Sequence, residues 1–304
     1  MRGPRWTPAS ADRGVRYARA VLARPPADAT PYPLEGVASW NMNTTCNYRC
    51  SYCTQRFVDD RKQWAKDLPA FVAAFVALPG DWEVKLSGGE PFRHPGFLDA
   101  VRDLAAGGVR VSVVTNFSDS EERLARFAEL TRERPGVLSA SMHLEYVDED
   151  AFVDKVRWFA PLHAGSTCVT CVATRHNLPR LPGLRARFAA IGVPFKVQPE
   201  KQDRDVIEYD DGEYGELIAL GGHNASGVVA PSFLGRACWA GARAMVVDHR
   251  GEAFRCYPAR RQRAERLGNL LDGTLRLHPT AEPCRYTFCN CTVPQERGMM
   301  DRRG

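Results

Sequence analysis

The feature that most constrains the fold is a regular alternation of β-rich and amphipathic segments that begins at residue 37. Six such units follow one another, and this alternation is typical of βα units that build a parallel sheet. The predicted strands span residues 37–43, 82–87, 109–116, 137–146, 166–174 and 194–200. The predicted helices lie near residues 65–78, 95–106, 119–131, 149–160 and 181–191.

Six units are fewer than the eight of a complete barrel, so we expect an α/β fold with a partial, open (βα)6 TIM-like barrel. Residues 37–200 would form this barrel after an N-terminal extension, residues 1–36, and the site would lie at the carboxyl ends of the strands. Residues 201–235 are acidic and then glycine-rich, which predicts a connector with little fixed structure of its own. Residues 236–304 are predicted to form a small cysteine-rich domain.

Composition narrows the class of protein. The longest apolar run, residues 70–78, is too short to span a bilayer and no targeting segment is visible, so we expect a cytoplasmic protein without a membrane partner. In a reducing compartment the ten cysteines favour metal or redox chemistry over disulfides. Basic residues gather at 258–266, as a solvated surface or as a contact for a phosphate-bearing or acidic partner. No aromatic residue is interleaved there to stack a base, so nucleic acid is not an expected partner.

Three cysteines, Cys46, Cys50 and Cys53, follow the first predicted strand in the stretch TTCNYRCSYCTQ. A structural zinc site needs four ligands, and no fourth stands nearby. Short cysteine spacings are typical of iron–sulfur clusters, and three thiolates on a [4Fe–4S] cluster leave one iron open to a substrate or cofactor. A CxxC redox pair formed by Cys50 and Cys53 is the alternative.

A second motif, SGGEP, follows the second predicted strand. Gly88 and Gly89 would let the backbone approach a ligand closely, and Glu90 would offer a charged acceptor to an ammonium group. An ordinary strand-to-helix turn is the alternative for this motif taken alone.

In this order, the CxxxCxxC loop and the GGEP turn resemble the radical SAM superfamily over residues 37–200. The resemblance implies that Cys46, Cys50 and Cys53 hold a [4Fe–4S] cluster whose open iron chelates S-adenosylmethionine (SAM). It further implies that the reduced cluster cleaves SAM to a 5′-deoxyadenosyl radical, with an electron donor such as flavodoxin or ferredoxin. The cofactor-binding residues that the resemblance suggests are Tyr52, Ser87, Gly88, Gly89, Glu90, Pro91, Thr115, Asn116, Ser141 and His143.

Two groups of these residues belong to the third and fourth predicted strands. The third predicted strand ends in TNF, with Phe117 where the TNG-type ending of the family often has glycine. In the fourth, Ser139, Ser141 and His143 share one face, which the resemblance turns toward the cofactor, with Ser141 the best candidate. Satisfied polar groups inside the barrel are the alternative for each of these residues.

The C-terminal cysteines form a second set. Cys238 and Cys256 flank Gly251 in the pattern C-x12-G-x4-C, and a tight turn at the glycine would allow a hairpin between them. The pattern resembles the twitch module, a shortened relative of the SPASM domain, which implies an auxiliary [4Fe–4S] cluster. A zinc site with four thiolates is the alternative. Five cysteines would compete for four irons: Cys238, Cys256, Cys284, Cys289 and Cys291.

Cys168 and Cys171 lie in the fifth predicted strand, three positions apart and therefore on opposite faces. They are interpreted as buried apolar residues, with a catalytic role as hydrogen-atom donor for one of them as the alternative.

The resemblance implies a radical SAM oxidoreductase or epimerase that acts on a small sugar-like or cyclitol-like substrate. A ribosomal-peptide maturase of the same superfamily is the alternative, and it would need a separate partner to recognise a leader peptide because 36 residues precede the barrel. A non-catalytic metal-binding protein is the third hypothesis.

Overall fold

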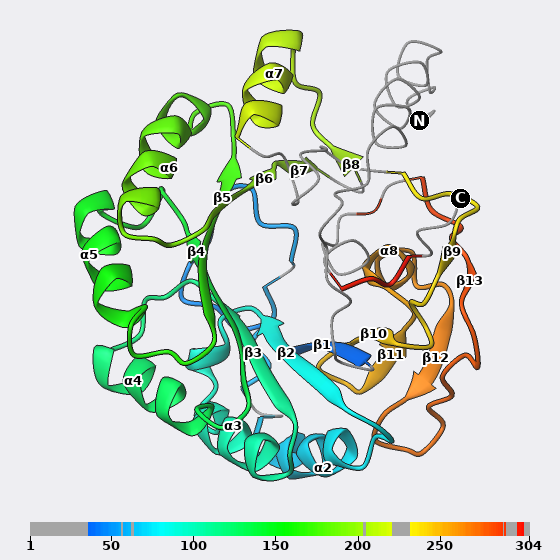
Figure 1. Cartoon of the computed structure of the whole chain (residues 1–304). Coiled ribbons are helices and arrows are strands. Elements are labelled where there is room, and N and C mark those ends of the chain that lie inside the picture. The colour runs from blue at the N-terminus through cyan, green and yellow to red at the C-terminus, as the bar shows by residue number, and fades with distance from the viewer. Residues whose placement is uncertain are drawn as a thin grey trace.

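The computed structural model describes residues 36–55, 57–61, 64–202, 205–220, 232–287, 289 and 297–300. Their main sheet has nine strands in the order β12-β11-β10-β1-β2-β3-β4-β5-β6. Figure 1 shows this sheet strongly curved, with helices α2 to α6 along its convex side. The parallel strands β1 to β6 span Gly36–Asn43, Trp82–Gly88, Arg110–Thr115, Pro135–Met142, Ser166–Ala173 and Phe195–Pro199.

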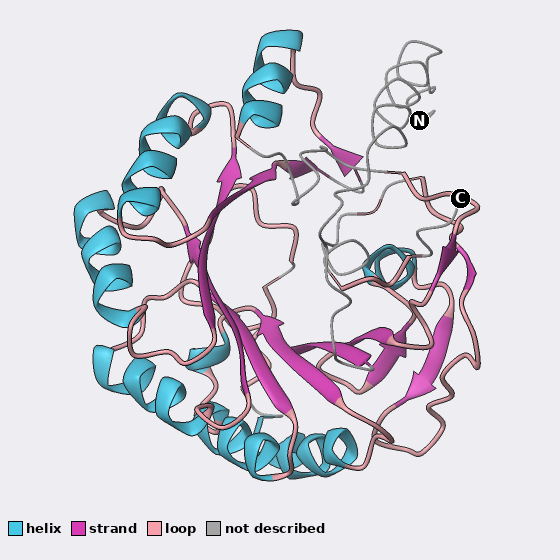
Figure 2. Cartoon of the chain, in the orientation of Figure 1, coloured by secondary structure: helices cyan, strands magenta, loops and turns pink. Residues whose placement is uncertain are grey.

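Amphipathic helices cover the convex face because alternate strand residues point toward them. On β2, for example, Val84 and Leu86 pack in the main core with α3, whereas Lys85 and Ser87 lie on the concave face. Figure 2 shows these helices in one row along the outer side of the curved sheet. Helices α2 to α6 span Trp64–Val76, Phe97–Ala106, Glu121–Leu130, Glu149–Phe159 and Leu181–Ala190, and the short 3-10 helices η1 and η2 span Pro91–Arg93 and Leu178–Arg180.

The predicted α/β partial barrel is confirmed, and most strand ends agree with the sequence to within a few residues. The fourth strand is the exception, since it ends at Met142 rather than at residue 146. Residues 143–146 form a turn instead, in which the Tyr146 N–H donates to the His143 carbonyl at 2.8 Å.

The C-terminal segment continues the barrel sheet. Strand β10 pairs with β1 in parallel, from Val37 opposite Ala244 to Trp40 opposite Val247, and the antiparallel strands β11 and β12 follow. Gly251 makes the predicted tight turn between β10 and β11, with φ of 83°. One sheet therefore spans the predicted domain boundary at residues 201–235. The remaining elements are β9 (Ala237–Cys238), β10 (Ala244–Val247), β11 (Glu252–Phe254), α8 (Tyr257–Gln262), β12 (Arg266–Asn269) and β13 (Glu282–Pro283).

The prediction that residues 201–235 have little fixed structure is wrong for their first part. Strands β7 (Lys201–Gln202) and β8 (Asp205–Val206) pair there, and helix α7 (Asp211–Ala219) follows. The acidic residues begin the helix, because Asp210 and Glu213 form a reciprocal capping box. Residues 221–231 lie outside the described part of the chain.

Candidate functional site

The cysteine loop leaves β1 at the carboxyl rim of the sheet, where a buried carboxylate holds its first turn. Asp60 accepts hydrogen bonds from the Thr44 N–H at 2.7 Å and from the Thr45 hydroxyl at 2.6 Å. These bonds fix the start of the loop just before the first cysteine. No local motif marks Asp60, so the sequence did not predict this role.

Two of the three thiols of the loop have raised pKa values, and Cys53 contributes to both shifts. Burial raises the pKa of Cys46, and Glu90 and Cys53 add to this effect. Burial also raises the pKa of Cys50 to about 11, with Glu145, Cys53 and Cys46 as further causes. Thiolates that repel one another are stabilised by bound cations, and metal binding releases the thiol protons. The donor set therefore fits an iron–sulfur cluster.

Within the described residues, no three histidine, cysteine, aspartate or glutamate side chains are arranged to hold a single metal ion. The ligands of one zinc ion must all lie within about 2.0–2.3 Å of it. Cysteines that hold a [4Fe–4S] cluster each bind a different iron, so their sulfurs stand further apart. The finding therefore concerns single-ion sites and not cluster sites.

The turn after β4 contacts the middle of the cysteine loop. The Ser51 N–H donates to Glu145 Oε2 at 2.9 Å, and the Arg49 N–H donates to Tyr146 Oη at the same distance. Both acceptors belong to residues that the sequence placed in a strand. Because the backbone turns there, their side chains reach the loop.

His143 lies beside two residues of the loop. Its Nδ1 is 2.9 Å from Tyr52 Oη and 3.3 Å from Cys50 Sγ, and its ring stacks on that of Tyr52. Burial lowers the pKa of His143 to about 4, so the imidazole is neutral at pH 7. The predicted residues Tyr52 and His143 therefore meet at the predicted cluster site.

The glycines of the GGEP turn allow it to touch the cysteine loop. Gly88 has φ of 133°, and a Cβ at Gly89 would lie 2.1 Å from the Thr45 carbonyl oxygen. The Gly89 N–H donates to the Asn43 carbonyl at 2.8 Å, and the Glu90 N–H donates to that of Thr45 at 2.9 Å. The close approach is thus to the chain's own backbone. Asn43 Oδ1 is buried here without a hydrogen-bond partner, and an unused acceptor suits the ammonium group of SAM.

Glu90 joins the GGEP turn to the end of β3. Its carboxylate accepts hydrogen bonds from the Phe92 N–H at 3.0 Å, the Thr115 hydroxyl at 2.8 Å and the Asn116 N–H at 2.6 Å. Complete burial raises the pKa of Glu90 to about 7, against the lowering effect of these three donors. Pro91 follows as the first residue of η1. The contact of Glu90 with SAM stays a prediction.

The TNF ending of β3 reaches the cysteine loop. Asn116 Nδ2 donates to Asn47 Oδ1 at 2.9 Å and lies 3.9 Å from Cys46 Sγ. Phe117 has φ of 60°, the left-handed conformation that explains why glycine suits this position. Its buried ring packs against Phe159 at a centroid distance of 5.5 Å, which offsets the backbone strain.

Polar side chains of β4 and β5 lie on the concave face of the sheet. The hydroxyls of Ser139 and Thr170 are 3.0 Å apart, and Ser141 is half-buried on the same face. Cys168 shares the face of Thr170 because it is two residues away. Cys171 packs instead in the core beneath the helices, so of this pair only Cys168 lies on the concave face.

Four of the five C-terminal cysteines meet in one buried cluster with Phe233 and Met300. Cys238 and Cys289 are buried and the other two are half-buried. The site offers four thiols, which is the number that a [4Fe–4S] cluster needs. Cys291 lies outside the described residues. The cysteines of this cluster are Cys238, Cys256, Cys284 and Cys289.

A buried arginine holds the backbone around these cysteines. Arg255 donates to the Ala240 carbonyl at 2.9 Å, to the Pro283 carbonyl at 3.0 Å and to the Glu282 carbonyl at 2.6 Å. It also pairs with Glu265 at 3.0 Å. One side chain therefore connects the segments on either side of the predicted auxiliary site.

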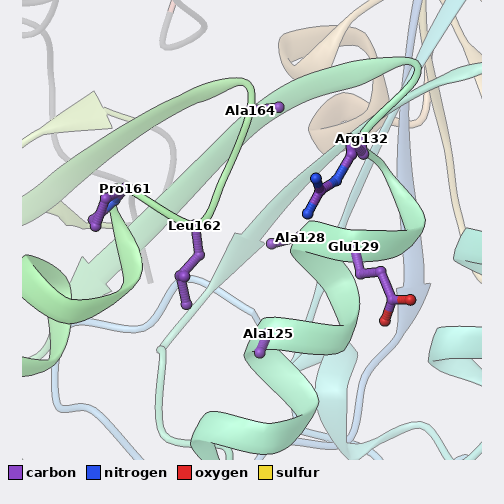
Figure 3. Close-up of a pocket in the computed structure, with 7 residues that line it drawn as sticks. All are labelled: Ala125, Ala128, Glu129, Arg132, Pro161, Leu162 and Ala164. Atoms are coloured by element: carbon purple, nitrogen blue, oxygen red, sulfur yellow. The ribbon is translucent and has the colours of Figure 1, made fainter.

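A surface pocket of about 500 Å³ lies elsewhere (Figure 3). Its lining comes from the last turns of α4 and from the loop between α5 and β5, so it is at the amino-terminal rim of the sheet. None of the predicted site residues lines it. Among the helices in the described ranges, none has the length and apolar character needed to cross a membrane.

Comparison with known proteins agrees with the two motifs. The family model of the Radical SAM superfamily matches residues 40–161. A curated GTP 3′,8-cyclase from Synechococcus elongatus is 30% identical over 119 residues, which are 37% of this chain and 35% of the cyclase. The matching segment thus spans about a third of that relative.

Two solved structures share the fold. SuiB from Streptococcus suis, bound to its precursor peptide SuiA, superimposes with a TM-score of 0.54 at 13% identity, covering 88% of this chain and 69% of SuiB. The protein anSMEcpe, with bound AdoMet and the Kp18Cys peptide, has a TM-score of 0.55 at 15% identity, covering 79% of this chain and 78% of that protein. At these identities the likeness concerns the fold alone.

Proposed function

We propose that this chain is an enzyme that removes a hydrogen atom from an unactivated C–H bond. The premise is the match of residues 40–161 to the family model of the Radical SAM superfamily. The proposed substrate is a small sugar-like or cyclitol-like molecule, and the outcome is a dehydrogenation or an epimerisation. The enzyme would work in the cytoplasm with an electron donor such as flavodoxin or ferredoxin.

The observation that carries this proposal is the direct bonding between the two motifs. The GGEP turn donates to the backbone of Asn43 and Thr45, at the start of the cysteine loop. Asn116, at the end of β3, contacts both Glu90 and the loop. In this arrangement the three loop cysteines would hold the first cluster, and Asn43 with the GGEP backbone would hold the amino group of SAM.

When bound, the first cluster and SAM supply a 5′-deoxyadenosyl radical, and an auxiliary cluster on the C-terminal cysteines supplies an electron acceptor. The chain itself orients and shields these groups. Neutral His143 would donate a hydrogen bond to the Cys50 thiolate. The stacked rings of Tyr52 and His143 would keep water from that side of the site.

The fate of the substrate radical separates the two outcomes. Dehydrogenation requires the radical to lose one electron and one proton, whereas epimerisation requires a thiol to return a hydrogen atom from the opposite face. The four clustered cysteines favour dehydrogenation, and Cys168 is the thiol available for epimerisation. In deuterated water an epimerised product would gain one deuterium, and a dehydrogenated product would be lighter than the substrate by two hydrogens.

Peptide modification is the second candidate function. The solved structures of SuiB and anSMEcpe favour this function, because each contains a bound peptide. Incubation of the reconstituted enzyme and SAM with sugar-like metabolites in one series and with peptides in another would separate the two substrate classes by product mass.

The central experiment is anaerobic reconstitution with iron and sulfide, followed by reduction and an assay for 5′-deoxyadenosine. We expect about eight irons per chain, because two [4Fe–4S] clusters need four each. We also expect 5′-deoxyadenosine from the native chain and from a Cys168→Ser control. Absence of 5′-deoxyadenosine from a fully loaded native chain would favour the non-catalytic metal-binding hypothesis.

A further inference from the structure

The basic segment at residues 258–266 is not a uniformly solvated surface. Its first half forms α8, which begins directly after Cys256. Figure 1 shows α8 on the inner side of β10 and β11, facing the concave side of the curved sheet. Two adjacent arginines of this helix, Arg260 and Arg261, are only partly exposed.

Arg260 reaches the predicted cofactor site. Asn41 of β1 accepts hydrogen bonds from Arg260 Nε at 3.3 Å and Nη1 at 3.1 Å when its amide nitrogen donates to Ser87 Oγ at 2.8 Å. Ser87 is the first residue of the SGGEP motif. The Arg260 guanidinium therefore lies next to the place where SAM and substrate would meet.

Arg261 has an unused guanidinium. No hydrogen bond or ion pair joins it to another residue in the described ranges, and its Nη1 is buried without a partner. Burial and the neighbouring charge of Arg260 both lower its pKa. A partly buried cation beside a second cation is costly unless an anion balances it.

Strand β2, next to β1, carries another positive charge. Lys85 shares the concave face of β2 with Ser87, two residues away. Glu83 lies on the same face, but Arg297 pairs with it at 2.9 Å. Among the described residues, no ion pair joins an acid to Lys85, Arg260 or Arg261.

We propose that Arg260 and Arg261 of α8, with Lys85 on the neighbouring strand β2, bind an anionic group of the substrate, either a carboxylate or a phosphate. The planar guanidinium matches both groups through paired N–H donors. The proposal rests on the proposed function, because it places this group beside the site that would hold SAM. It narrows the substrate to a small molecule or peptide with an acidic group that reaches α8.

The test uses the reconstituted, SAM-loaded enzyme with the variants Arg260→Gln, Arg261→Gln and the double variant. Arg266→Gln is the matched control, because Arg266 is half-exposed and pairs with Glu252 at 2.7 Å on the outer strand β12. Equilibrium dialysis at low ionic strength measures the binding of labelled inorganic phosphate in one arm and labelled acetate in the other. The dissociation constant for SAM and the formation of 5′-deoxyadenosine without substrate are measured on the same samples.

We expect the native enzyme and the control to bind one anion per chain, and each arginine variant to bind it about 10-fold or more weakly. The arm with the tighter binding identifies phosphate or carboxylate as the preferred group. SAM binding and 5′-deoxyadenosine formation should be unchanged in all variants.

Equal anion binding by native enzyme and double variant would overturn the proposal, as would binding of neither anion by the native enzyme. Weaker SAM binding in Arg260→Gln would also overturn it, because the arginines would then hold the carboxylate of SAM. Loss of 5′-deoxyadenosine in the native enzyme, with anion binding intact, would reject the proposed function but not the anion site.

Discussion

Arg255 allows a direct test of how the C-terminal cysteine site is built. Its side chain is 2% exposed, and its guanidinium donates to backbone carbonyls on two segments and to Glu265. Arg255→Met keeps much of the volume and removes every donor. Each buried carbonyl that loses its donor costs about 1–3 kcal/mol, whereas Glu265 keeps Arg285 at 3.7 Å and the Tyr286 hydroxyl. The cost falls on the segments that carry Cys238 and Cys284.

We therefore expect Arg255→Met to lower the iron content from about eight per chain to about four. Formation of 5′-deoxyadenosine should persist, because the first cysteine loop is on a separate segment. Arg255→Lys keeps the charge without the planar fork and should hold an intermediate amount of iron. Arg276→Gln is the surface control, since that side chain contacts only exposed carbonyls. About eight irons and an unchanged free energy of unfolding in Arg255→Met would refute the reasoning.

Three further changes test the rim of the sheet. Cys50→Ala should abolish 5′-deoxyadenosine and leave about four irons, and continued cleavage would reject its role as a ligand. The pKa of Glu90 rises from 4.5 to about 7 on folding, so the stability that its proton confers is present below pH 4.5 and is lost as the pH rises to about 7. Urea unfolding of Glu90→Gln should lack this decline, and parallel pH curves for both proteins would contradict the shift. Phe117→Gly relieves about 1 kcal/mol of strain but loses about 3–5 kcal/mol of aromatic packing, so urea should unfold it more easily than the native chain.

The barrel and its motifs could be predicted because their signals are local. Alternation of strand and helix patterns identifies each unit, and parallel strands bring their carboxyl ends to one rim. Cys46 and Glu90 therefore meet in the structure although they are far apart in the sequence. The left-handed backbone of Phe117 could likewise be expected, because the TNG-type ending that this sequence resembles often has glycine at that position.

The contacts that were missed depend on pairing between distant segments. Asp60 acts through two hydrogen bonds to the start of the cysteine loop, and its sequence neighbourhood carries no pattern for this. Tyr146 was placed in a strand because its neighbours are β-rich, whereas the turn directs it to the loop. Helix α7 was missed because Asp210 and Gly212 resemble loop residues, although Asp210 is the cap that begins the helix.

The pairing of β10 with β1 sets the relation between the two cysteine sites. Because the strands are parallel, the turn after β10 emerges at the same rim as the cysteine loop after β1. A shift of one residue in this register would exchange the two faces of β10 and displace β11 and α8 relative to β1. Arg260 would then lose its place beside Asn41, and Cys256, four residues earlier, would move with it. The same strand pairing therefore positions both the proposed electron acceptor and the proposed anion site relative to the SAM-binding rim.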